Sequence, residues 1–220
     1  MVFGKLYTYP HNPRVAKILI TAKYSGAELE IDGDFEMGKT NYTKEFLAKF
    51  PLGKVPAFEG ADGLKLFESS AIAFHVANSK DNNPLLGRDK QEASQIWQWI
   101  LYSENEFNPH ISAWSGPLMG YMQYNEFVHQ KAITALKRAL ASLDKHLASH
   151  TYMVGESITL ADIAVFTSLK FGFQFLFEEE FRKDYQNVTR HFTMCKNIEQ
   201  FKSVVGEFEL CKETMKPANK

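Results

Sequence analysis

The character of the sequence changes at Asp81-Asn82-Asn83-Pro84. Before this stretch, short strand-like segments alternate with helical ones, whereas from Lys90 onward nearly every signal is helical. The four residues favour turns and predict a linker. A chain of 220 residues is long enough for two domains of ordinary size. We therefore expect an α/β domain over residues 1–80, a linker over 81–89, an all-helical domain over 90–210, and a tail or the start of a further linker over 211–220.

The first 80 residues predict the element order β-α-β-α-β-β-α. Short apolar or aromatic runs mark the strands, and apolar residues at helical spacing mark the helices. In chain order the segments are strand Lys5–Tyr9, helix Val15–Ala22, strand Leu29–Ile31, helix Phe46–Phe50, strands Val55–Phe58 and Leu64–Phe67, and a helix from Ser69 to about Asn78. The early β-α-β unit implies a parallel pair, and the turn residues Gly60-Ala61-Asp62-Gly63 imply an antiparallel hairpin. A small mixed sheet with helices on its faces is expected.

The second half contains a long amphipathic helix and a well-marked helix start. Apolar residues recur at intervals of three and four along one seam: Ile133, Leu136, Leu140, Leu143 and Leu147. Charged residues off that seam are expected to be solvated: Lys137, Arg138, Asp144 and Lys145. Thr159 followed by Asp162 predicts an N-cap with a capping box. Phe171–Phe177 alternates with the period of a strand but has no partner strand, so a helix end or loop is expected there.

Charge and composition exclude several classes of protein. The net charge of -1 argues against a nucleic-acid-binding module. No apolar run reaches the roughly 20 residues that a membrane-spanning helix needs, and the first residues do not resemble a signal peptide. Cys195 and Cys211 form no disulfide framework, so a cytoplasmic location is expected.

Familiar enzyme motifs are missing from the sequence, which contains no GxGxxG, GxxxxGK[ST], GxSxG or HExxH. His146 and His150 stand four residues apart and could share a metal ion. Because no acidic residue accompanies them in the pattern, no metal site is expected.

The most informative motif is Gly53-Lys54-Val55-Pro56 followed by Glu68-Ser69. A proline at the start of a strand cannot join the ladder, and a cis bond before Pro56 would turn the Val55 backbone towards an extended ligand. Ser69 opens a helix whose first N–H groups can bind a carboxylate. One interpretation is a slot for a small extended peptide with an anionic end. The other is that Pro56 only shapes a turn and Ser69 only caps a helix.

With these motifs in this order, and Ile158-Thr159-Leu160-Ala161-Asp162 in the helical half, the sequence resembles the cytosolic glutathione transferase superfamily over residues 2 to about 208. The resemblance implies a thioredoxin-like N-terminal domain, an all-helical C-terminal domain, and a glutathione-binding set of His11, Lys54, Val55, Pro56, Glu68 and Ser69. Pairing into homodimers is a further family-level expectation.

Further segments resemble the gamma-subunit family of eukaryotic translation elongation factor 1: Leu6–Pro10, Asn41–Gly60, Ala113-Trp114, Tyr152–Glu156 and Asn187–Phe192. This resemblance implies binding to the guanine-nucleotide-exchange subunit. The charge balance argues against direct contact with nucleic acid, and no membrane contact is expected. The resemblance also implies that a Lys/Pro/Ala-rich linker and a further domain follow, so the chain is expected to be an N-terminal region or a shortened relative.

Catalysis requires a group that stabilises the glutathione thiolate. The resemblance places His11 where one class of transferase has a catalytic Ser, and Tyr7 or Thr8 where other classes have a catalytic Tyr. Tyr7 and His11 are therefore candidates only, and core packing is the favoured role for Tyr7. We expect a structural subunit that needs no cofactor and takes glutathione at most as a ligand; the alternative is an active glutathione transferase.

Overall fold

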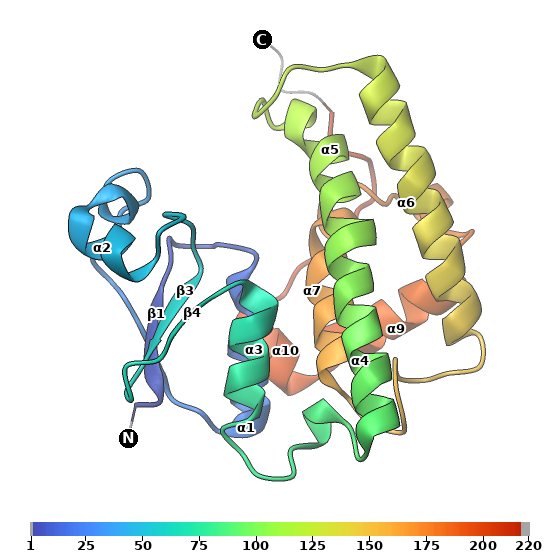
Figure 1. Cartoon of the computed structure of the whole chain (residues 1–220). Helices are drawn as coiled ribbons and strands as arrows, with labels where there is room; N and C mark the ends of the chain where they lie inside the picture. Colours follow the sequence, from blue (N-terminus) through green and yellow to red (C-terminus); the bar gives the residue numbers. More distant parts are fainter. Residues whose placement is uncertain (1, 217–220) are drawn as a thin grey trace. The chain divides into compact units, whose positions relative to one another are not determined.

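A computed structural model describes residues 2–216 of the chain. The chain divides into two compact units, Met1–Arg88 and Asp89–Lys220. The first unit combines a sheet with helices, and the second is entirely helical within its described residues (Figure 1).

The first unit contains a mixed four-stranded sheet with the strand order β2-β1-β3-β4. The strands are β1 (Gly4–Tyr7), β2 (Leu29–Ile31), β3 (Ala57–Gly60) and β4 (Lys65–Phe67). Strand β1 is parallel to β2 and antiparallel to β3, and β3 is antiparallel to β4. The mixed sheet predicted from the sequence is confirmed.

Helices lie against both faces of this sheet (Figure 1). They are α1 (Val15–Ser25), α2 (Lys44–Lys49) and α3 (Ser69–Ala77), with the short 3₁₀ turns η1 (Thr40–Tyr42) and η2 (Pro84–Leu86). Helices α1 and α3 pack against each other, and Ile18 and Ile72 are fully buried. Helix α2 contributes Phe46 to a second apolar cluster with Phe35 and Phe50. This layered arrangement is the predicted thioredoxin-like domain.

The stretch 81–89 is ordered around the buried side chain of Asn83. Its Nδ2 donates to the Ala77 carbonyl and to Ser25 Oγ, and its Oδ1 accepts from the Leu85 N–H. These bonds tie the stretch to α1 and α3, so the first unit runs on to Arg88.

The second unit is a helical bundle. Its elements are α4 (Lys90–Tyr102), the π-helical stretch η3 (Ser103–Phe107), α5 (Asn108–Leu118), α6 (Glu126–Leu147), α7 (Leu160–Phe175), α8 (Glu179–Arg182), α9 (Gln186–Asn197) and α10 (Glu199–Val205). Helix α7 is buried along most of its length and packs against α4, α5 and α9. None of the helices within residues 2–216 is both long and apolar enough to cross a membrane. The helices given above confirm the predicted all-helical second domain within its described residues.

Phe171–Phe175 forms the last part of α7, and Leu176 and Phe177 follow directly after the helix. Phe173 and Phe177 are buried, and the Phe173 ring stacks on Phe192 of α9 with centroids 3.9 Å apart. Phe171 and Phe175 contact each other and are only partly buried. The strand-like alternation arises because aromatic residues occupy both faces of the helix end.

The prediction that Asp144 is solvated was wrong. Its Oδ1 accepts the backbone N–H groups of Asn187 and Val188, and its Oδ2 accepts the Asn187 side-chain amide. The first N–H groups of a helix lack partners within the helix, so a carboxylate from another element can cap them. Asp144 therefore joins α6 to the start of α9.

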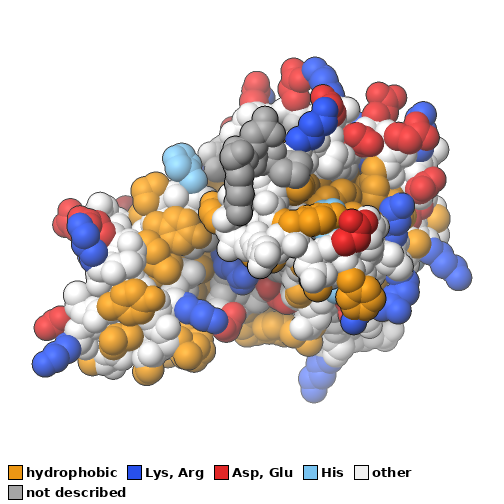
Figure 2. All heavy atoms as spheres, turned by 90° about the horizontal axis from the view of Figure 1, so that it is seen from above, with side chains coloured by type: hydrophobic (Ala, Val, Ile, Leu, Met, Phe, Trp, Pro, Cys, Tyr) orange, Lys and Arg blue, Asp and Glu red, His pale blue; other side chains and the backbone are white. Residues whose placement is uncertain are grey.

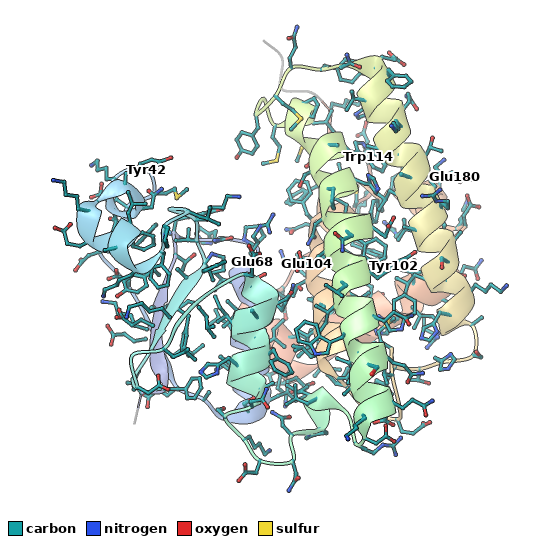
Figure 3. The ribbon with its side chains drawn as sticks, viewed as in Figure 1. Tyr42, Glu68, Tyr102, Glu104, Trp114 and Glu180 are labelled. Atoms are coloured by element: carbon teal, nitrogen blue, oxygen red, sulfur yellow. The ribbon has the colours of Figure 1, made fainter. Side chains whose placement is uncertain are left out.

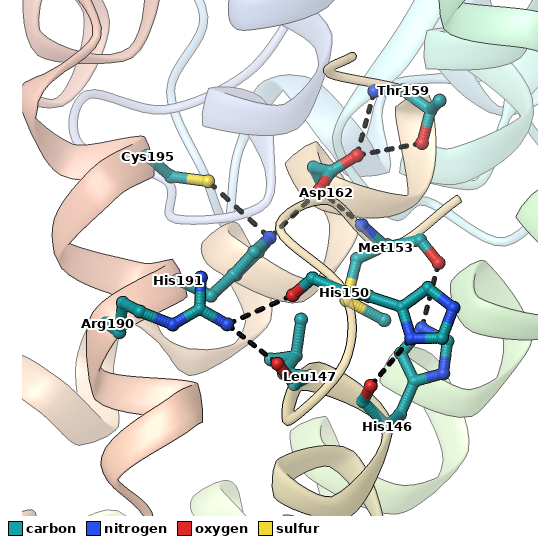
Figure 4. Close-up of polar contacts among 9 residues, drawn as sticks. All are labelled: His146, Leu147, His150, Met153, Thr159, Asp162, Arg190, His191 and Cys195. Atoms are coloured by element: carbon teal, nitrogen blue, oxygen red, sulfur yellow. Dashed lines mark hydrogen bonds and ion pairs between the residues drawn. The ribbon is translucent and has the colours of Figure 1, made fainter. Parts of the chain in front are cut away.

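Asp162 is the polar centre of the second unit (Figure 4). Its fully buried carboxylate accepts the backbone N–H of Met153 and both the N–H and the hydroxyl of Thr159, at 2.8 to 2.9 Å. Nε2 of His191 on α9 lies 2.9 Å from its Oδ1. The sequence predicted Asp162 as a partner of Thr159, and the structure adds that it connects α7 with α9 and with the loop before α7.

Replacing Asp162 by Ala should lower the free energy of unfolding of the second unit by about 3 kcal/mol or more, because several buried donors lose their acceptor. The matched control is Thr159→Ala, which should cost only about 1 kcal/mol. Trp97, Trp99 and Trp114 all lie in this unit, so tryptophan fluorescence during guanidinium unfolding measures it selectively. Equal losses in the two variants would contradict the central role of Asp162.

Candidate functional site

Three chain segments meet at one end of the sheet in the first unit. The ladder pairs Ala57 with Tyr7 on one side and with Phe67 on the other. Residues just after Tyr7, just before Ala57 and just after Phe67 therefore leave the sheet at the same end. This register places the segments that contain His11, Val55 and Ser69 at one end of the sheet, although they are far apart in the sequence.

The Val55–Pro56 peptide bond is cis, as the slot interpretation supposed. Pro56 is buried and Val55 half-buried, whereas Lys54 is exposed. Because both ladders of β3 begin at Ala57, the backbone of Val55 lies outside them. This placement leaves Val55 beside the sheet end, where an extended ligand can pair with it.

Asn41, which the sequence analysis did not single out, fixes the approach to Val55. Its fully buried side chain donates from Nδ2 to the Gly53 carbonyl at 2.9 Å and accepts the Gly38 N–H at 2.6 Å. Gly53 has φ +58, and a Cβ there would lie 2.9 Å from the Asn41 carbonyl oxygen.

Glu68 makes the connection between β4 and α3 alone. It has φ 68 and ψ 115, a conformation that costs a non-glycine residue about 1–3 kcal/mol. Its side chain is exposed at the N-terminal end of α3 (Figure 3), and the buried Ser69 begins the helix. The first intrahelical bond runs from the Ile72 N–H to the Glu68 carbonyl. The backbone N–H groups that precede Ile72 in α3 have no partner within the helix, and together with the helix dipole they favour a carboxylate at the N-terminal end of α3.

The entry to α1 places His11 and Asn12 very differently. His11 is exposed and has φ 62. Asn12 is buried, donates from Nδ2 to Thr8 Oγ1 at 3.1 Å, and accepts the Arg14 N–H at its Oδ1. The Thr8 hydroxyl in turn donates to the Tyr9 carbonyl. The hydroxyl of Thr8 and the amide of Asn12 are thus engaged with each other and with the backbone.

Tyr7 points to the sheet face that carries α2, where its ring packs edge-on against Phe46 with centroids 5.7 Å apart. Its hydroxyl donates to Glu59 Oε2 at 2.8 Å, and Lys49 Nζ lies 2.6 Å from the same oxygen. Burial and the neighbouring Glu59 carboxylate raise the pKa of Tyr7, while Lys49 lowers the pKa of Glu59. The phenol therefore stays protonated and is committed to Glu59.

The two histidines considered as metal ligands both face backbone carbonyls (Figure 4). His146 Nε2 lies 2.9 Å from the Met153 oxygen, and His150 Nδ1 lies 2.8 Å from the His146 oxygen. Across residues 2–216, no three His, Cys, Asp or Glu side chains form a group that could hold a metal ion. Burial raises the pKa of the Cys195 thiol well above its usual value, so this cysteine is not a reactive thiolate.

Known protein families match both units. Residues 3–78 match the N-terminal domain of glutathione S-transferase, and residues 105–199 match its C-terminal domain. Poplar glutathione transferase F1 has the same fold, with a TM-score of 0.80 and 22% identity, and the match covers 93% of this chain and 97% of that one. The chain belongs to the glutathione S-transferase superfamily.

Within that superfamily the chain is similar to elongation factor 1-gamma. It is 47% identical to the Artemia salina protein over 97% of this chain and 49% of that protein, and 47% identical to a Xenopus laevis form over 96% and 48%. The glutathione transferase-like domain of elongation factor 1-gamma from Saccharomyces cerevisiae matches with a TM-score of 0.84 and 24% identity, covering both chains fully. The chain spans about half the length of the curated relatives.

The variant Tyr7→Phe should equal the unchanged chain in assays of glutathione binding and thiol conjugation, because the removed hydroxyl serves Glu59. It should lose only about 1 kcal/mol of stability, the value of one hydrogen bond. Retention on immobilised glutathione and a conjugation assay test this, with the exposed Tyr42→Phe as the control. A clear loss of conjugation in Tyr7→Phe alone would make Tyr7 a thiolate donor after all.

Proposed function

We propose that the chain is the glutathione transferase-like domain of a translation elongation factor 1 complex, where it binds the guanine-nucleotide-exchange subunit. The observation that carries the proposal is the identity of 43–47% to elongation factor 1-gamma proteins over nearly the whole chain. The glutathione transferases among the solved structures share about half that identity. The cytoplasm is the corresponding location.

The surface composition supports a role through protein contacts. The net charge is -1, and acidic and basic side chains are interspersed with apolar ones on the face shown in Figure 2. A strongly basic surface that would hold nucleic acid is not part of this pattern. Pairing of two copies, as is common in symmetric assemblies, belongs to the proposal as an expectation from the fold.

The exchange subunit should co-purify with this chain in equal amounts when the two are expressed together. Size-exclusion chromatography with light scattering measures both the complex and the state of the free chain. A related glutathione transferase of the same fold is the control and should not bind. A mixture that elutes as separate components would remove the main support for the proposal.

Glutathione conjugation is the second candidate function. Its support is the slot made by Lys54, Val55 and Pro56 together with Glu68 and Ser69, and His11 stands exposed at the same end of the sheet. Against turnover stands the engagement of Tyr7 with Glu59 and of Thr8 with Asn12 and the Tyr9 carbonyl. We infer that glutathione is a ligand of this slot and that no cofactor is required. Of the catalytic candidates Tyr7, Thr8 and His11, only His11 has an exposed side chain.

We expect measurable glutathione binding with conjugation close to the uncatalysed rate. Ser69→Ala should weaken binding by about tenfold, because one hydrogen bond to a charged carboxylate contributes roughly 1.5 kcal/mol. Ser79→Ala is the matched control, since its hydroxyl donates to the Val76 carbonyl at the other end of α3. Isothermal titration gives the affinities, and an assay with an electrophilic aryl chloride gives the rates. Rapid turnover that His11→Ala abolishes would favour the enzyme instead.

A further inference from the structure

Helix α6 carries two faces of different chemistry. Leu136, Leu140, Leu143 and Leu147 are fully buried and hold the helix on the bundle, where α6 packs against α5 and α9. The opposite face repeats at the same intervals of four and three. It consists of exposed residues: Phe127, Lys131, Thr134, Arg138, Ala141 and Lys145.

The basic residues of this outer face, which we term the α6 stripe, are Lys131, Arg138 and Lys145. They are seven residues apart, so they lie nearly in line and span about 21 Å at 1.5 Å per residue. In the described part of the chain none of the three forms an ion pair. Elsewhere on the surface, exposed lysines do pair with glutamates: Lys39, Lys183, Lys202, Lys212 and Lys216.

The acidic residues of α6 leave the stripe uncompensated. The carboxylate of Asp144 accepts N–H groups at the start of α9, so it does not pair with the cations of the stripe. Glu126 stands next to Phe127 and is rotated by about 100° around the helix axis. The three cations therefore stand on one line with no α6 carboxylate among them, and Glu106 of η3 is a carboxylate from another element that acts, like Arg138, on Tyr102. Such a line of like charges attracts an anionic partner.

The residues between the charges favour one kind of partner. Thr134 and Ala141 are small, which allows the backbone of another helix to approach closely. A spacing of seven residues is the repeat at which two helices packed side by side meet. At one end Phe127 is 75% exposed and offers an apolar anchor. A nucleic acid would be held by a wider basic surface, whereas this stripe is one residue wide.

We propose that the outer face of α6 is a docking surface for an acidic amphipathic helix of another protein. Carboxylates at successive heptads of that helix meet Lys131, Arg138 and Lys145, and an apolar residue at its end packs on Phe127. This goes beyond the proposed function, because binding of the exchange subunit specifies neither this surface nor the charge pattern of the partner helix.

The test uses the full chain and a synthetic helical peptide of about three heptads with one glutamate at the same position in each heptad. The triple variant Lys131→Glu, Arg138→Glu, Lys145→Glu should weaken binding at least about tenfold, and binding by the unchanged protein should weaken as salt is added. The matched control Lys183→Glu, Lys202→Glu, Lys212→Glu changes the net charge equally but reverses lysines that already face glutamates. It should bind within about twofold of the unchanged protein. Circular dichroism verifies that both variants fold.

Two further arms decide between partners. A peptide of the same composition with its glutamates distributed around the helix should bind weakly, and Phe127→Ser should weaken the patterned peptide by several-fold. Equal binding of both peptides, or equal loss in both triple variants, would reduce the effect to net charge and overturn the proposal. Binding of a single-stranded RNA oligonucleotide that depends on the α6 stripe, without binding of the peptide, would overturn it as well.

Discussion

The pairing of β3 between β1 and β4 is the constraint on which the candidate site depends. Ala57 is opposite Tyr7 in one ladder and opposite Phe67 in the other, so three loops emerge together. A shift by one residue would turn every side chain of β3 to the other face, which the buried Phe58 does not allow. The hydrophobic core thus fixes the register, and the register brings the three segments of the candidate site to one end of the sheet.

At this end of the sheet, the groups that could bind a ligand are available, whereas the hydroxyls that could act in catalysis are not. The backbone of Val55 and the start of α3 remain available, since the ladders begin at Ala57 and the first intrahelical bond begins at Ile72. The hydroxyls that could act on a thiol are engaged inside the first unit: Tyr7 with Glu59, and Thr8 with Tyr9 and Asn12. In the first unit the backbone of Val55 lies outside the ladders while the hydroxyls of Tyr7 and Thr8 serve internal bonds, an arrangement that favours binding over catalysis.

Local patterns predicted most of the fold because each relevant signal lay within a few residues. Gly26 ended α1 in the left-handed conformation, and Thr159 with Asp162 marked the start of α7. What the sequence did not reveal were contacts between distant segments. Asp144 caps a helix that begins about forty residues later, and Asn41 reaches across to Gly53. Nothing in the spacing of either residue distinguishes such a partner from solvent.

The candidate site shows the same division. The motifs around Pro56 and Ser69 were readable because proline and helix-start chemistry are local, whereas the role of Tyr7 depended on Glu59, fifty-two positions away. Helix α6 combines a face that the local sequence predicts with a face whose role depends on a distant partner. Its period places the leucines inward and, by the same geometry, aligns Lys131, Arg138 and Lys145 outward. The bundle explains the inner face, but no ion pair within the described chain engages the three cations of the outer face. Because the packing of α6 does not require these three cations, binding of another protein is the better explanation for their alignment.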